Sequence, residues 1–207
     1  MKSITTYITE KMVYTKNSVP KHKYHPKTKK ELRSIISDKI KEEGHNADFN
    51  DIDVSKITDM SLLFASLEDS QRQRFNGDIS EWNVSNVTTM EGMFQGCLNF
   101  NQDISNWNVS KVTSMRYMFS WCKLFNQPLN DWNVSNVTDM GYMFKHCEKF
   151  NQPLDEWNIS KVKDVESMFY RCKSFNQNIY PWNTSNIELA DDIFYDCGIE
   201  EINRPKL

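Results

Sequence analysis

Large apolar positions recur along this chain in a pattern that repeats every 25 residues, with polar residues between them. Tryptophan and cysteine mark the period, and they stand at Trp82, Trp107, Trp132, Trp157 and Trp182 and at Cys97, Cys122, Cys147, Cys172 and Cys197. A fixed period of this length is the signature of a solenoid or another repeat array. Because no single copy can bury its apolar side alone, the pattern predicts a stack of copies that share one continuous core.

Within one copy, the spacing of the apolar residues changes from two to three or four. Trp107 and Val109 would face the same way in an extended segment, whereas Asn108 would face the other way. The next apolar residues fall at helical spacing, at Val112, Met115, Met118, Phe119 and Cys122. We therefore predict the α/β fold class, as a solenoid of short parallel strands and short helices with an N-terminal helical cap. The frame of bulky residues from Ile104 to Phe119 resembles that of a leucine-rich repeat, so the expected architecture is a leucine-rich-repeat-like solenoid.

The repeats divide the chain into four predicted parts. They are a basic and partly flexible arm (1–27), a cap helix (28–44), a solenoid of one degenerate and five regular copies (45–198) and a C-terminal tail (199–207). The cap helix is predicted because Thr28 and Glu31 form a capping box, and Gly44 ends the apolar pattern. The degenerate copy carries five additional residues within 66–74, which we expect to lie in a loop on one face.

The sequence of the copies resembles the repeats of a known family. Residues 132–152 read W-N-V-S-N-V-T-D-M-G-Y-M-F-K-H-C-E-K-F-N-Q, and they resemble the 25-residue repeats of the BspA-like leucine-rich-repeat "surface protein" family, which has bacterial and phage-encoded members. The resemblance covers roughly residues 24–198. It implies a curved solenoid with an adhesion or protein-binding role, and it implies no catalytic residues.

Charge is unevenly distributed along the chain. Residues 1–43 hold 11 Lys and Arg against 5 Asp and Glu, a net charge of +6, and the remainder has a net charge of −9. We interpret the basic end as solubilising charge. Such charge could instead contact an acidic partner or nucleic acid, but we do not expect a nucleic-acid partner. Neither a secretory signal nor an apolar run long enough to span a membrane is visible. We expect no membrane insertion and a location in the cytoplasm or on a virion.

No motif in the sequence points to catalysis. The patterns G-x-x-x-x-G-K-[ST], G-x-G-x-x-G, H-E-x-x-H and G-x-S-x-G do not occur, so we expect no enzyme, no metal and no cofactor. The cysteines lack the C-x-x-C pairs of zinc sites. Neighbouring copies would place them within reach of a disulfide, but we favour buried thiols. The tryptophans share the register of the valines and are expected in the core, rather than on a stacking platform for sugars or bases.

Two columns of asparagine recur with the period. The first occupies the outward position of the predicted strand, which would line a concave face, at Asn83, Asn108, Asn133 and Asn158. These side chains would either contact a partner or form a hydrogen-bonded ladder. The second column follows the phenylalanines, at Asn76, Asn101, Asn126, Asn151 and Asn176. For this column we favour a ladder that satisfies backbone groups of the turns.

Binding specificity is best sought where the copies differ. Positions of the predicted helices that vary between copies carry aromatic and basic residues, at Tyr117, Trp121, Tyr142, His146, Tyr170 and Arg171. Such residues are enriched in protein-binding hot spots, and the alternative is a set of scattered, half-buried ridge residues. We expect a non-enzymatic protein–protein interaction module with a protein partner. The alternatives are a structural component of a larger assembly such as a virion, docked through the N-terminal arm, and a carbohydrate-binding adhesin.

Overall fold

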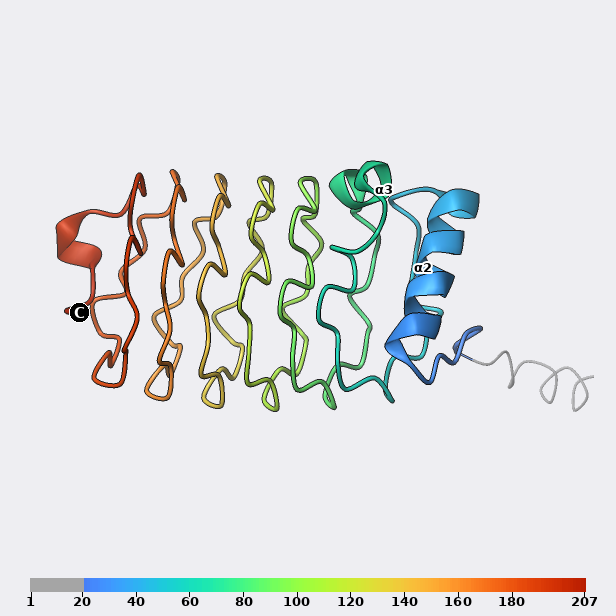
Figure 1. Cartoon of the computed structure of the whole chain (residues 1–207), viewed down its shortest axis with the longest axis horizontal. Coiled ribbons are helices and arrows are strands. Elements are labelled where there is room, and N and C mark those ends of the chain that lie inside the picture. Colours follow the sequence, from blue (N-terminus) through green and yellow to red (C-terminus); the bar gives the residue numbers. More distant parts are fainter. Residues whose placement is uncertain (1–20) are drawn as a thin grey trace, which may run out of the picture.

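The computed structural model describes residues 21–207, which form one elongated stack of coils (Figure 1). Helix α2, Lys29–Glu43, lies at one end of the stack, and the C-terminus lies at the other. The other helices in the described part are α3, Asp69–Arg74, and the 3₁₀ helix η1, Glu201–Asn203. Residues 1–20 of the predicted N-terminal arm lie outside the described residues.

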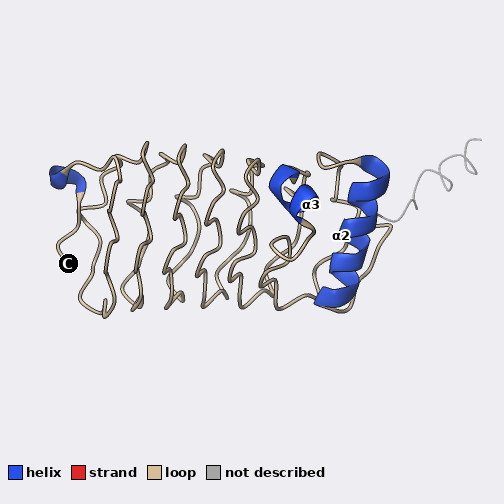
Figure 2. Ribbon diagram, turned by 45° about the horizontal axis from the view of Figure 1, so that its top comes forward, coloured by secondary structure: helices blue, strands red, loops and turns tan. Residues whose placement is uncertain are grey.

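The predicted fold class is wrong. Between residues 21 and 207 there is no strand, and the regular copies contain no α-helix (Figure 2). Each coil consists of turns and irregular segments, and isolated parallel bridges join neighbouring coils, as between Thr89 and Ser114 and between Ser114 and Asp139. The protein is therefore a solenoid of stacked turns, and not an α/β, leucine-rich-repeat-like solenoid of parallel strands and short helices.

The segment predicted as a short helix does not form one because left-handed residues interrupt its backbone. The φ angles of Tyr117 and Trp121 are 57° and 65°, which a right-handed helix cannot contain. The N–H groups of these two residues donate to the carbonyls of Gly141 and Lys145 in the next coil, at 2.9 and 2.7 Å. Backbone bonds that a helix would make along the chain are thus made along the stack.

Within the segment that holds the left-handed residues, the coil-to-coil bonds run in one direction. The donors in one coil are the N–H groups of Met115, Tyr117, Phe119 and Trp121, and the acceptors are the carbonyls of Asp139, Gly141, Met143 and Lys145. Between them, the N–H groups of Met118, Ser120 and Cys122 donate to carbonyls three residues earlier. The alternation satisfies the backbone of a buried segment without helix or sheet.

The segment predicted as a strand is a succession of turns. Trp107 and Val109 both face the core, as predicted. The N–H of Trp107, however, donates to the carbonyl of Ile104 in the same coil, and the side chain of Asn108 accepts from the N–H of Ser110 at 3.1 Å. The two-residue period therefore arises from turns stabilised by an asparagine side chain, and not from a strand ladder.

One apolar core runs through the whole stack. The predicted burial of the tryptophan row is confirmed, because all five indoles are 6% exposed or less. The predicted burial of the thiols is also confirmed for four of the five free cysteines, and Cys197 is half-buried. Rows of aromatic rings stack from coil to coil, as where the ring centroids of Phe94 and Phe119 lie 5.6 Å apart with only 4° between the ring planes.

Polar atoms within the core and along its edge bond from one coil to another. The indole N–H of Trp132 donates to the carbonyl of Ile104 at 3.1 Å, and the thiol of Cys147 donates to the carbonyl of Phe119 at 2.9 Å. The predicted ladder of the second asparagine column is confirmed, because the N–H of Asn126 donates to Oδ1 of Asn101 at 2.9 Å and the same bond recurs along the column. Buried polar groups thus stabilise the stacking instead of opposing it.

Helix α2 covers the first coil. Thr28 Oγ1 accepts from the N–H of Glu31 at 3.2 Å, and the helix buries Leu32, Ile36 and Ile40. Lys39 is buried beside them, with its ammonium group 3.1 Å from both Glu43 and Asp51. Burial alone would lower the pKa of Lys39, but the hydrogen bonds to the two carboxylates raise it above its ordinary value. Lys39 is therefore charged in the folded cap.

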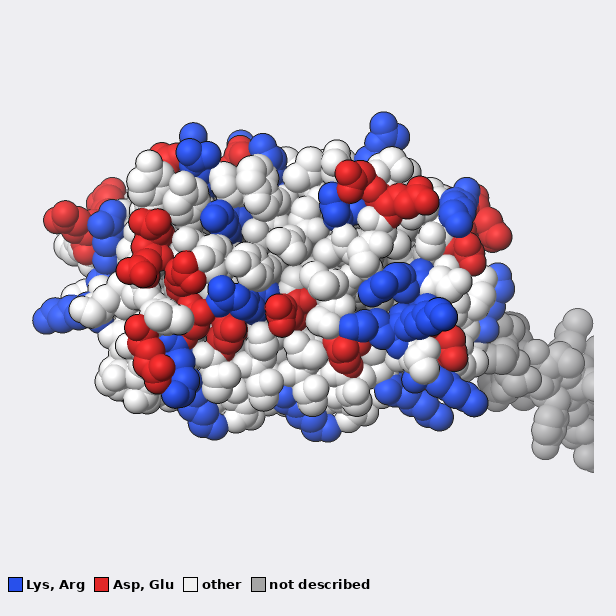
Figure 3. Space-filling model, viewed as in Figure 1, with Lys and Arg blue, Asp and Glu red and all other residues white. Residues whose placement is uncertain are grey.

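Charge remains divided between the ends of the folded stack. Figure 3 shows Lys and Arg side chains densest beside α2, and Asp and Glu side chains most numerous toward the C-terminal end.

The longest of the described helices, α2, has 15 residues. No helix within residues 21–207 combines the length and the apolar character required to cross a membrane.

The left-handed positions can be tested at an exposed residue of the last regular copy. Asp192 has a φ of 55°, which a β-branched side chain opposes and glycine tolerates. We expect Asp192→Val to lower the free energy of unfolding by about 1–2 kcal/mol more than Asp192→Gly, measured by urea denaturation. Asp191→Val, at an exposed neighbour whose φ is not positive, is the control. Equal effects of the two valine substitutions would contradict the assignment.

The thiols provide a second prediction. Burial raises the pKa of Cys97, Cys122, Cys147 and Cys172, so these residues hold almost no thiolate at about pH 8. We expect a thiol-specific disulfide reagent to modify Cys197 first and the other four only at the rate of unfolding. Simultaneous modification of all five cysteines in native buffer would show that the row is open to solvent.

Candidate functional site

The six variable residues predicted as a binding site come together on one surface. We call this set the outer patch: Tyr117, Trp121, Tyr142, His146, Tyr170 and Arg171. The rings of Tyr117 and Tyr142 are stacked at a centroid distance of 4.6 Å, and those of Trp121 and His146 at 3.7 Å. Tyr170 continues the second row, with its ring 5.7 Å from that of His146. The rings are therefore not scattered, but Tyr117, Tyr142 and Tyr170 are half-buried, as the alternative of ridge residues expected.

Most of the outer-patch residues stand at left-handed positions of the backbone. Five outer-patch residues have φ angles between 57° and 65°: Tyr117, Trp121, Tyr142, His146 and Arg171. Equivalent positions in other coils, such as Leu62, Ser167 and Asp192, also have positive φ. Backbone strain often marks functional sites, but here it belongs to the coil architecture. Only the identity of the side chains sets the outer patch apart.

Two cationic groups lie over the rings, and one of them, Lys145, connects the two rows. Lys145 Nζ lies 5.0 Å from the ring centroid of Tyr142 and 4.6 Å from that of Tyr170. The guanidinium carbon of Arg116 lies 5.1 Å from the ring of Tyr117 and 4.9 Å from that of Tyr142. Each such contact contributes about 0.5–1 kcal/mol where it is exposed. Together they hold the aromatic side chains in one orientation.

A group of carboxylates fixes Arg116 and Tyr142 from beneath. Arg116 is bonded to Asp164, and its guanidinium lies 3.5 Å from Asp139 and 3.7 Å from Glu166. The hydroxyl of Tyr142 donates to Glu166. This hydrogen bond, with burial, raises the pKa of Tyr142 to about 12, so the hydroxyl stays protonated at neutral pH. Side chains fixed in this way lose little entropy when a partner binds.

The outer-patch residues differ in what a partner could reach. Trp121 is 41% exposed, whereas His146, stacked against it, is only 7% exposed. Burial first, and then the positive charges of Arg171 and Lys145, lower the pKa of His146. His146 is therefore a neutral support for the indole of Trp121. It is not placed as a general base, since no carboxylate bonds to its ring among the described residues.

The asparagine column predicted for the concave face lies apart from the outer patch. Asn83, Asn108, Asn133 and Asn158 are exposed. Each Oδ1 accepts from the N–H two residues further along the chain, at 3.1–3.2 Å. Asn133 and Asn158 line a shallow polar hollow together with Asn130 and Glu156, and no outer-patch residue lines it. The first column thus stabilises turns and keeps only its amide N–H groups for other contacts.

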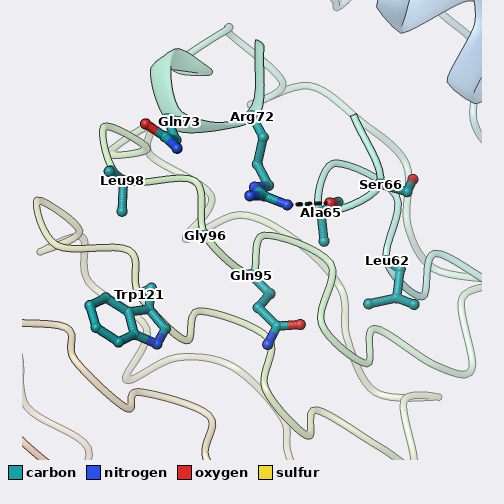
Figure 4. A pocket seen from close by; sticks show the side chains of 9 residues that line it. All are labelled: Leu62, Ala65, Ser66, Arg72, Gln73, Gln95, Gly96, Leu98 and Trp121. Atoms are coloured by element: carbon teal, nitrogen blue, oxygen red, sulfur yellow. Dashed lines mark hydrogen bonds between the residues drawn. The ribbon is translucent and has the colours of Figure 1, made fainter. Parts of the chain in front are cut away.

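A cavity that the sequence reasoning missed lies beside Trp121 (Figure 4). It has a volume of about 470 Å³ and is lined by Leu62, Ala65, Ser66, Arg72, Gln73, Gln95, Gly96, Leu98 and Trp121. Two signals were present in the sequence. Glycines stand at 92 and 96, where later copies carry aromatic residues, and the insertion in the preceding copy supplies α3. Across residues 21–207, no three His, Cys, Asp or Glu side chains gather as metal ligands would.

Stacked 25-residue coils and a surface patch built from their variable positions define a repeat protein of the solenoid class. The chain belongs to the family described as "Mycoplasma protein of unknown function, DUF285", whose model matches residues 31–143 and 105–204. Neither a curated protein nor a solved structure matches the chain. Family membership therefore supports the repeat organisation and leaves the activity to be argued from the site.

The ionisation of His146 gives a testable prediction. Its NMR titration midpoint should lie below the ordinary value of 6.5. Since the pKa is lower in the folded state than in the unfolded state, the protein should lose stability as the pH falls from about 6.5 through the folded-state pKa. Arg171→Gln removes a nearby positive charge and should move the midpoint upward. Lys161→Gln, at an exposed lysine bonded to Asn136, should leave it unchanged. A midpoint at or above 6.5 would contradict the burial of this ring.

Proposed function

We propose that this protein is a non-enzymatic protein–protein interaction module that holds its partner on the outer patch. One observation carries the proposal. Variable aromatic and basic residues of three successive coils form a connected surface through ring stacking, as between Tyr117 and Tyr142, and through cation–π contacts such as that of Lys145 with Tyr170. Tyrosine, tryptophan and arginine are the residue types that dominate binding energy at protein interfaces.

The rigidity of the surface supports the proposal. Each outer-patch residue stands on a coil whose backbone is bonded to the next coil, and the rings are further held by Arg116 and Glu166. Association is costly when side chains must be ordered at the interface, so a surface that is already ordered retains more of its contact energy. A recurring backbone with changing side chains is also how repeat proteins generally acquire specificity.

The wording of the repeat supports a binding role as well. Within its family, we propose that the chain belongs with the BspA-like "surface protein" group, whose repeats resemble residues 132–152. That resemblance implies adhesion or protein binding. The leucine-rich-repeat fold is not part of the proposal, because the coils contain neither its strands nor its helices.

A protein partner is favoured over a glycan by the position of the tryptophans. Sugar-binding surfaces need exposed aromatic faces, and the five tryptophans of the repeat are 6% exposed or less. Trp121 is the one tryptophan outside that row, and it already stacks on His146 with one face. Lys123 Nζ also lies 5.7 Å from the centroid of the Trp121 ring. The outer patch therefore offers mixed aromatic and cationic contacts of the kind that protein surfaces make.

The proposal is tested by partner capture from cells that produce the protein. Trp121→Ala combined with Tyr142→Ala removes two central rings and should weaken binding of the captured partner by at least about tenfold, measured by calorimetry once the partner is identified. Asn108→Ala combined with Asn133→Ala, in the separate asparagine column, is the matched control and should retain the partner.

Near-ultraviolet circular dichroism must show both double variants folded. Retention of the partner by the ring variant, together with its loss from the asparagine variant, would reject the outer patch in favour of the asparagine column. Removal of residues 1–20 separates the remaining alternative, because a component of an assembly docked through its N-terminal arm would lose its partner only on that truncation.

A further inference from the structure

We propose that the cavity beside Trp121 receives one aromatic side chain, a phenylalanine or tyrosine, from the partner protein. The inference rests on the proposed function and deepens it, since it names the part of the partner that anchors the contact. It assigns a role to Leu62, Gly96 and Leu98, which the outer patch itself does not use.

The cavity exists because two irregularities of the array lie side by side. In the column of residues 96, 121 and 146, the rings of Trp121 and His146 stack at 3.7 Å, but position 96 is glycine. The indole face turned away from His146 is therefore not covered by a column neighbour, and it lines the cavity (Figure 4). On the other side, the insertion folds as α3 and places Arg72 and Gln73 along the rim.

The close approach of α3 leaves little space for a side chain at position 96. Gly96 has a φ of 77°, and a Cβ added there would lie 3.0 Å from Nε of Arg72. The guanidinium of Arg72 is fixed in this position by the carbonyl of Ala65, at 3.2 Å, and by Asp69, at 2.6 Å. Any side chain at position 96 would enter the space between Arg72 and Trp121. The cavity thus occupies the place where a ring at position 96 would continue the row formed by Trp121 and His146.

The lining favours an uncharged aromatic ring. Leu62, Ala65 and Leu98 provide aliphatic walls, and Trp121 provides an indole face. Leu62 and Trp121 are 46% and 41% exposed, so apolar surface remains to be buried when the cavity is filled. Aromatic pairs contribute about 0.5–1.5 kcal/mol beyond the burial of area.

The polar groups of the rim argue against other occupants. Asp69 pairs with one end of the Arg72 guanidinium and reduces the net positive charge that the cavity offers to a carboxylate. Nε of Arg72 is buried without a hydrogen-bond partner and can donate to a neutral oxygen of the occupant. A sugar would need several fixed polar partners, and the aliphatic walls do not supply them. The amides of Gln73 and Gln95 are suited instead to a tyrosine hydroxyl or to the peptide groups beside an aromatic residue.

The test is a titration with 4-methylphenol, which reproduces the tyrosine side chain, followed by ¹⁵N NMR of the full chain. The indole N–H groups of the five repeat tryptophans donate to buried carbonyls, and we expect their resonances to stay unchanged. The indole resonance of Trp121 is assigned as the one that is lost in Trp121→Phe. We expect saturable shifts of the Trp121 indole and of the Gly96 amide. Methyl glucoside at equal concentration should shift neither. Absence of saturable shifts with 4-methylphenol, or stronger shifts with the glucoside, would overturn the proposal.

Two variants locate the site. Gly96→Asn fills the cavity with a residue that tolerates positive φ, and Leu62→Asn removes an exposed apolar wall that is also at a positive φ. Each should weaken 4-methylphenol binding by at least about tenfold. Leu189→Asn, at an exposed leucine outside both the cavity and the outer patch, is the matched control and should leave the binding unchanged. If Gly96→Asn fails to fold, Leu62→Asn decides alone.

The same variants separate this inference from the proposed function. If loss of the two outer-patch rings releases the partner while Gly96→Asn and Leu62→Asn retain it, the outer patch stands and the cavity is not its anchor. Release of the partner by the cavity variants as well supports the anchor. Retention of the partner by every one of these variants would overturn both proposals.

Discussion

The set of backbone hydrogen bonds that join each coil to the next is the constraint on which the rest of the structure depends. Left-handed residues recur at two positions of each regular copy, and they turn alternate N–H groups along the axis of the stack, as at Tyr117 and Trp121. A left-handed conformation costs a residue other than glycine about 1–2 kcal/mol. Bonds to the next coil and ring stacking with its side chains offset that cost. Stability is therefore shared between neighbours, as in other repeat proteins.

The same constraint separates the core from the recognition surface. Residues between the left-handed positions, such as Met118 and Phe119, face inward and are fully buried, while the left-handed positions range from exposed, as at Trp121, to covered by neighbouring rings, as at His146. Because the backbone bonds do not depend on the outward side chains, those side chains can differ from copy to copy without loss of the fold. The outer patch and the cavity beside Trp121 both arise from this freedom, one where rings are present and the other where glycine replaces them.

The sequence predicted the features that depend on side-chain burial, and it failed for those that depend on backbone direction. The repeat, the buried tryptophan and thiol rows and the second asparagine ladder followed from the period and the residue types. The prediction of strands and helices was wrong because a two-residue or four-residue spacing shows only which side chains face inward. Turns can produce the same spacing. The residue types at positions 117 and 121 do not indicate a positive φ, since tyrosine and tryptophan rarely adopt it.

The candidate site was predictable to a similar degree. Variable positions identified the members of the outer patch, because residues one period apart must lie in adjacent coils. Their contacts with Arg116 and Lys145, and the burial of His146, required the three-dimensional arrangement. The cavity was missed because it needs three facts at once, namely the glycine at 96, the insertion before it and the path of α3 over that glycine.

The central claim is tested most directly by NMR scalar couplings that pass through hydrogen bonds, from an amide nitrogen to the carbonyl carbon that accepts its proton. In a uniformly ¹³C,¹⁵N-labelled and deuterated sample, the amide nitrogen of Trp121 should couple to the carbonyl carbon of Lys145, and that of Tyr117 to the carbonyl carbon of Gly141. A coupling from Trp121 to the carbonyl carbon of Tyr117, four residues earlier, would instead reveal an α-helix in each copy and would contradict the stacked-turn architecture.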